Sequence, residues 1–160
     1  MRRMYYLTIT AAIILPLIIT GCTQFTPDSR YNTQASLSAM EYTISANKEI
    51  GLVLNLLEEH MTNGKNVLKN RYPVTDEIDN LNHTLIMVKE AIDSIDRLLP
   101  PDSYEDDRLD TLRRMENARE TLESYAIALE SSVPEELSVA IDLMGGDFAA
   151  LKGSFNIQWE

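Results

Sequence analysis

The sequence predicts an all-α fold, an antiparallel bundle of about four helices that follows a cleaved N-terminal segment. Three observations lead to this prediction. Apolar residues recur at steps of three and four along most of residues 34–151. Prolines divide this region into runs of helical length. No stretch shows the alternation and the Val, Ile and Thr enrichment of a β-sheet, and amphipathic helices with short links most simply pack as an antiparallel bundle.

Length and composition indicate one folded domain. The chain has 160 residues, of which 44% are hydrophobic and 24% are charged, a balance typical of globular proteins. The net charge is −11, and removal of Arg2 and Arg3 with the N-terminal segment takes it to −13. A surface with this much negative charge repels the phosphate backbones of nucleic acids and anionic lipid head groups. The composition therefore argues against nucleic acid as a partner, and against a membrane reached through charge.

The first 21 residues have the order of parts of a secretory signal peptide. Arg2 and Arg3 give a positive start, residues 7–19 are apolar and uncharged, and small residues follow. The apolar run is shorter than the roughly 18 residues expected of a spanning helix, and Pro16 interrupts it. We therefore expect a cleaved segment rather than a permanent transmembrane anchor.

Cys22 is the only cysteine of the chain, and it ends the run Ile19, Thr20, Gly21, Cys22. A single cysteine excludes an internal disulfide and any cysteine-cluster metal site. The run resembles the lipobox of bacterial lipoproteins; an ordinary signal peptide or a membrane stub with a chance cysteine is the other interpretation. The resemblance implies that the Cys22 thiol is joined to diacylglycerol, that lipoprotein signal peptidase cuts before Cys22, and that acyl chains such as palmitate anchor the mature protein.

The same resemblance predicts the location and the organisation of the chain. Thr23 rather than Asp follows the cysteine. The resemblance therefore implies that the mature protein is anchored in the outer membrane, if the host has one, and otherwise on the extracytoplasmic face of the cell membrane. Residues 23–33 are polar and short-sided, with Pro27 among them, which is typical of a flexible tether. We therefore expect a signal peptide in 1–21, the lipidated cysteine and tether in 22–33, and an acidic helical domain in 34–160.

Two long helices are expected first. The first helix begins near Gln34, and either Asn63-Gly64 ends it or it continues to the break before Pro73. The second has the most regular apolar stripe in the chain and stops at Pro100-Pro101. The residues expected in the core are Leu37, Met40, Ile44, Ile50, Val53, Leu54, Leu57 and Met61 of the first helix, and Ile78, Leu81, Leu85, Val88, Ile92, Ile95 and Leu99 of the second.

Two further helices complete the expected bundle. Asp102 with Glu105 predicts an N-cap and a capping box for the third, and Ser132 before Pro134 predicts an N-cap for the fourth. Gly145-Gly146 within the fourth helix predicts either a close neighbour or a break. The tail, Phe155 to Trp159, is expected to dock on the bundle end. The expected core residues are Leu109, Leu112, Met115, Leu122, Tyr125, Ala126 and Leu129, then Leu137, Ile141, Met144, Phe148 and Leu151.

The link between the second and third helices carries a further resemblance. Pro100, Pro101 and Tyr104, followed by Arg108, are similar to a segment of small uncharacterised helical lipoproteins, chiefly of Gram-positive bacteria. There a Pro-Pro-x-x-Tyr-x-x-x-His hook joins two bundle helices, and Arg108 stands where the histidine is usual. The likeness covers roughly residues 92–151 and implies a sharp turn with the tyrosine on its inner side.

The residues that carry chemistry form no recognisable catalytic or metal motif. His60 follows two glutamates near an expected helix end and His83 lies off the apolar stripe, so we expect both to be exposed on the surface. Neither has the Glu-x-x-His spacing of a di-iron bundle, and neither provides a base for a nucleophile. The methionines left after cleavage lie mostly at core spacing and indicate gap filling. We therefore expect no enzyme, no cofactor and no metal ligand set.

Two functions remain open at this point. The first is a membrane-anchored extracytoplasmic lipoprotein that acts as a non-enzymatic interaction or structural module of the cell envelope, and binds another envelope protein or itself. The second is a small-ligand or cation-binding bundle that uses a pocket at Gly145-Gly146 or an acidic face, formed by Asp76, Glu77, Asp79, Asp93 and Asp96.

Overall fold

The computed structural model of the protein describes residues 36–154. They form four α-helices and no strand, which confirms the predicted all-α bundle. The helices are α1 (Ala39–Leu68), α2 (Val74–Asp96), α3 (Glu105–Ser131) and α4 (Pro134–Ser154), with a short 3₁₀ turn, η1 (Asp102–Tyr104), before α3. Cys22 and the rest of the lipobox-like run lie outside these residues, as does the tail after Ser154.

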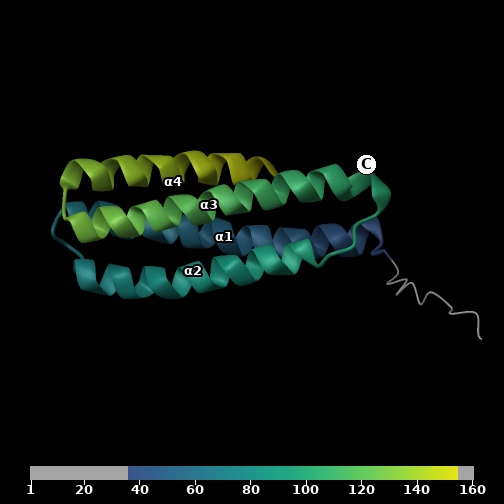
Figure 1. Cartoon of the computed structure of the whole chain (residues 1–160), viewed down its shortest axis with the longest axis horizontal. Coiled ribbons are helices and arrows are strands. Elements are labelled where there is room, and N and C mark those ends of the chain that lie inside the picture. Colours follow the sequence, from purple (N-terminus) through teal and green to yellow (C-terminus); the bar gives the residue numbers. More distant parts are fainter. Residues whose placement is uncertain (1–35, 155–160) are drawn as a thin grey trace, which may run out of the picture. The chain divides into compact units, whose positions relative to one another are not determined.

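Each helix packs against two others around a common core. α1 lies beside α2 and α4, and α3 lies beside the same two helices, so α1 and α3 face each other diagonally and make only a small direct contact (Figure 1). Helices that follow one another in the chain run in opposite directions. Within the described part of the chain, no helix is both long and apolar enough to cross a membrane.

α1 continues past the first of its two predicted ends. Ser38 caps its start, and the side chains and backbones of Ser38 and Glu41 form a full capping box. The helix runs through Asn63-Gly64 and ends at Leu68, just before Asn70 adopts a left-handed φ of 54°. Of the two ends considered, the one before Pro73 is therefore close to the real one.

Both predicted side-chain caps are wrong. Asp102 belongs to η1, and α3 starts after Tyr104 with no side-chain cap hydrogen bond. At α4 the carbonyl of Val133, not of Ser132, accepts the first helical hydrogen bond, from Leu137 N–H at 3.1 Å. Ser132 instead ends α3 in the left-handed conformation, with φ 56°.

The predicted apolar stripes are mostly buried, with a group of exceptions near one end of the bundle. Arg114 Nη1 donates to the carbonyl of Ala150 at 2.5 Å, so the last turns of α4 lie beside the first half of α3, and Figure 1 shows α4 ending partway along α3. Within residues 36–154, the first turns of α1 and α3 extend past that end, and no fourth helix lies beside them. The predicted core residues found exposed are Met40, Ile44, Leu99 and Leu109.

The hook before α3 forms as a sharp turn. The Tyr104 ring packs edge-on against Tyr42 of α1, with ring centroids 5.6 Å apart. Arg108 reaches back to the end of α2, where its Nη1 donates to the backbone and the carboxylate of Asp96, at 3.1 Å each. Arg108 therefore joins the two helices, and its aliphatic stem and charged head are largely covered.

Candidate functional site

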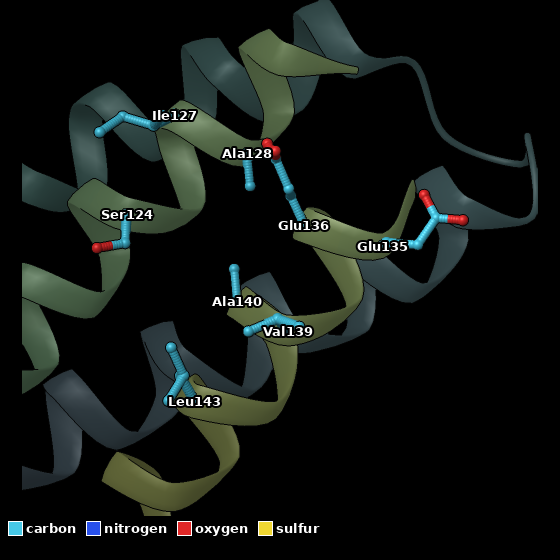
Figure 2. A pocket seen from close by; sticks show the side chains of 8 residues that line it. All are labelled: Ser124, Ile127, Ala128, Glu135, Glu136, Val139, Ala140 and Leu143. Carbon is cyan, nitrogen blue, oxygen red and sulfur yellow. The ribbon is translucent and has the colours of Figure 1, made fainter. Parts of the chain in front are cut away.

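An open groove runs between α3 and α4 on the surface of the bundle, with a volume of about 350 Å³ (Figure 2). Its walls carry three large apolar side chains that solvent reaches: Ile127 is 67% exposed, Val139 59% and Leu143 54%. Its floor is formed by the small, buried side chains of Ala128 and Ala140. The remaining lining residues are Ser124, Glu135 and Glu136.

The groove exists because apolar residues occur on two sides of α3 and α4. Tyr125 and Leu129 of α3, and Ile141 and Met144 of α4, already fill the core. Ile127, Val139 and Leu143 lie off these core stripes and have no neighbouring helix in the described bundle. Surface apolar residues scattered singly are ordinary, but here they share one groove, which marks a candidate interaction site.

Carboxylates flank the apolar side chains on the outer side of each helix. Glu123 and Glu130 stand four residues before and three after Ile127, and Glu135 and Asp142 stand in the same places around Val139. Residues at these spacings share a helix face, so each apolar wall is bordered by negative charge.

The hairpin that forms the groove is also one-sided in charge. Residues 120–151 contain no Lys, Arg or His. The acidic residues in this stretch are Glu120, Glu123, Glu130, Glu135, Glu136, Asp142 and Asp147.

A second cluster of polar residues lies inside the bundle, where α1, α2 and α3 meet. His60, Glu77, Thr84 and Tyr125 are each at most 2% exposed. The predicted surface position of His60 is therefore wrong, and Glu77 belongs to the core rather than to an acidic face. His83 is exposed, as predicted.

The side chains of this cluster form one hydrogen-bonded chain. His60 Nδ1 lies 2.6 Å from Glu77 Oε1, and His60 Nε2 lies 2.8 Å from Thr84 Oγ1. The Tyr125 hydroxyl donates to the same Glu77 oxygen at 3.0 Å. Burial, and then the neighbouring Glu77 carboxylate, raise the pKa of Tyr125 far above its usual value, so this phenol stays protonated.

Gly64 makes the room that Tyr125 needs. A Cβ at Gly64 would lie 2.7 Å from the Tyr125 hydroxyl and 2.9 Å from Ile141 Cδ1. α1 therefore lets α3 and α4 approach at this position because residue 64 has no side chain. The glycine predicted as a possible helix end instead serves close packing.

Thr84, His60 and Glu77 are bonded in the order hydroxyl, imidazole, carboxylate, which is also the order of a nucleophile, its base and the group that orients the base. No such base was predicted from the sequence, because His60 was expected at the surface. All three side chains are enclosed, so a substrate could reach Thr84 only if the bundle opened. The arrangement therefore fits a polar link between α1 and α2.

The sequence did carry a signal for this cluster. His60 is three residues after Leu57 and seven before Val67, which are both buried, and so continues the apolar stripe of α1. Glu77 and Thr84 are four before and three after Leu81, on the buried stripe of α2. Polar residues at core spacing indicate a buried hydrogen-bonded group.

The proposed cation-binding features are not assembled in the structure. Among residues 36–154, no group of three or more His, Cys, Asp or Glu side chains could hold a metal ion. Asp96 pairs with Arg108. α4 continues unbroken through Gly145-Gly146, where an added Cβ would meet only the Met61 sulfur at 3.7 Å, or nothing within 4 Å. Neither the predicted close neighbour nor the predicted break is present.

Comparisons of the chain with protein-family models, with curated proteins and with solved structures found no match. Its function is therefore inferred from its own residues.

Proposed function

We propose that this chain is a lipid-anchored extracytoplasmic protein that acts as a non-enzymatic interaction module of the cell envelope, with the groove between α3 and α4 as its binding face. The observation that carries the proposal is the exposure of Ile127, Val139 and Leu143, which line the same groove. An apolar groove bordered by charged residues is typical of a surface that binds another protein.

The anchoring part of the proposal is supported by the likeness of Ile19–Cys22 to a lipobox. Each buried CH₂ group of an acyl chain contributes about 0.8 kcal/mol to membrane binding, so two or more chains hold a protein stably. An acidic domain gains nothing from anionic head groups. Lipid on Cys22 supplies the attachment that its charge would not.

The non-enzymatic part is supported by the chemistry of the two clusters. The groove offers carboxylates, one serine hydroxyl and aliphatic side chains, which lack a base paired with a nucleophile. The histidine that could serve as a base is enclosed with Thr84 and Glu77. Binding is thus better supported than catalysis by the residues that solvent reaches.

Mass spectrometry and fractionation of the native protein test the anchor. We expect the mature chain to begin at Cys22 with acyl chains attached, and to sediment with membranes. A Cys22→Ala variant is expected to remain uncleaved by lipoprotein signal peptidase. A native protein that starts at Met1, or that carries a free thiol at Cys22, would contradict the anchoring proposal.

A further inference from the structure

The occupant of the groove can be specified from its shape and its charge. We infer that the α3/α4 groove receives one amphipathic helix of a partner protein, with an apolar stripe along its middle and Lys or Arg residues on both flanks. This inference rests on the proposed function and adds the chemistry of the partner.

The apolar walls fit a helix because of their length and spacing. Residues 135–143 of α4 rise by about 12 Å at 1.5 Å per residue, which matches two to three turns of a helix lying along the groove. Val139 and Leu143 are one turn apart on α4, and Ile127 lines the groove from α3, with its side chain directed away from α4 (Figure 2). A partner helix with apolar anchors at i, i+3 or i+4, and i+7 would cover all three side chains.

The charge of the rims specifies the flanks of that helix. Glu123 and Glu130 border one wall, and Glu135 and Asp142 border the other. Glu123 pairs with Arg119, and among the described residues no ion pair is formed by the other three. Basic residues on both edges of a docked helix would meet these carboxylates, which favours association and orients the helix.

The same charges disfavour two other occupants. A second copy of this chain would bring acidic rims against acidic rims, and residues 120–151 hold no basic side chain to offset them. An anionic lipid surface would meet the same repulsion. A basic helix is the occupant that satisfies both the apolar walls and the rims.

Photo-crosslinking in the cells that produce the full-length chain tests this inference. A photoreactive phenylalanine analogue replaces Val139 in the groove, and in a control chain it replaces Ile86 of α2, which is 57% exposed. We expect an adduct from position 139 and none from position 86. The crosslinked peptide, identified by mass spectrometry, should have apolar residues at helical spacing with Lys or Arg on both sides.

Charge reversal at the groove tests the role of the acidic rims, and the same reversal on α2 is the matched control. Glu135→Lys with Asp142→Lys should lower the yield of the position-139 adduct about tenfold, since two charge pairs are reversed. Asp79→Lys with Asp93→Lys on α2 changes the net charge equally and should leave the yield unchanged. Circular dichroism checks that both variants keep their helices.

The outcomes separate this inference from the proposed function. An adduct with a second copy, with lipid, or with a segment that lacks basic flanks would overturn the inference, as would a yield that ignores the charge reversal. Adducts from position 86 alone would overturn the inference, but the proposed function as an interaction module would stand, with a different binding face. Adducts from neither position would count against both.

Discussion

The hydroxyl of Tyr125 in α3 lies 2.7 Å from the place that a Cβ of Gly64 in α1 would occupy. Real Cβ atoms do not come this close to a neighbour, and the hydroxyl is held by its bond to the buried Glu77. Since Ile141 Cδ1 of α4 would lie 2.9 Å from the same Cβ, one missing side chain sets the packing of three helices.

Gly64→Ala is therefore expected to destabilise the protein. Overpacking of a close-packed core costs about 1–3 kcal/mol, and the better helix propensity of alanine offsets about 1 kcal/mol of that cost. We expect a net loss of up to about 2 kcal/mol in the free energy of unfolding, measured by urea denaturation.

Gly146→Ala provides the matched comparison, because it makes the same change in a helix where nothing lies within 4 Å of the new Cβ. Without a steric cost, only the helix propensity remains, and we expect a gain of about 1 kcal/mol. Equal effects of the two substitutions would show that Tyr125 and Ile141 move aside easily.

The His60–Glu77 pair is expected to show strong non-additivity. His60→Leu or Glu77→Leu alone leaves one polar partner buried without its counterpart, which costs about 3–5 kcal/mol. The double variant removes both groups, so its cost should be well below the sum of the two. Denaturation of the two single variants and the double variant gives this coupling energy, and additive losses would mean that the two side chains do not depend on each other.

The enclosed Thr84 is expected to be chemically inert in the folded protein. A fluorophosphonate probe, which labels activated hydroxyls, should not label the wild-type chain, because Thr84 is only 2% exposed. Thr84→Val keeps the shape of the side chain and removes the hydroxyl, so it is the control. Labelling of the folded wild type that disappears in Thr84→Val would contradict the proposal of a non-enzymatic function.

The periodicity of apolar residues predicted the four helices because burial of one face is the main constraint on a helix in a bundle. It failed at Met40, Ile44 and Leu109, since a stripe shows which face is apolar but not how far the neighbouring helix extends. In the described part of the chain α4 ends near Arg114, so the first turns of α1 and α3 have no fourth helix beside them there.

The two sites were predicted less well for different reasons. His60 was judged from its acidic sequence neighbours, whereas its spacing to Leu57 and Val67 places it in the core. The groove was not predicted, because Ile127, Val139 and Leu143 come from two helices, and only the pairing of α3 with α4 places them together. Local sequence cannot show which surface residues of separate helices become neighbours.

Tyr42 gives a prediction for alkaline pH. Burial, and then the nearby Asp107 carboxylate, raise the pKa of Tyr42 to about 12, against about 10 in the unfolded chain. Below pH 10 the phenol is neutral in both states, and its contribution to stability is fully present. As the pH rises from 10 to 12 the unfolded chain releases the proton first, so the folded state loses about 2 kcal/mol. Burial likewise raises the pKa of Tyr125, so the two losses add.

Tyr42→Phe isolates that contribution, because the Tyr42 hydroxyl has no hydrogen-bond partner among the described residues. Loss of a buried hydroxyl without a partner should cost little or stabilise the fold by about 1 kcal/mol, and it should remove part of the decline above pH 10. Thermal denaturation of both proteins between pH 8 and pH 12 measures the difference. Identical alkaline profiles would mean that Tyr42 ionises as readily in the folded protein as in the unfolded chain, and that the packing of Tyr104 against it does not exclude water.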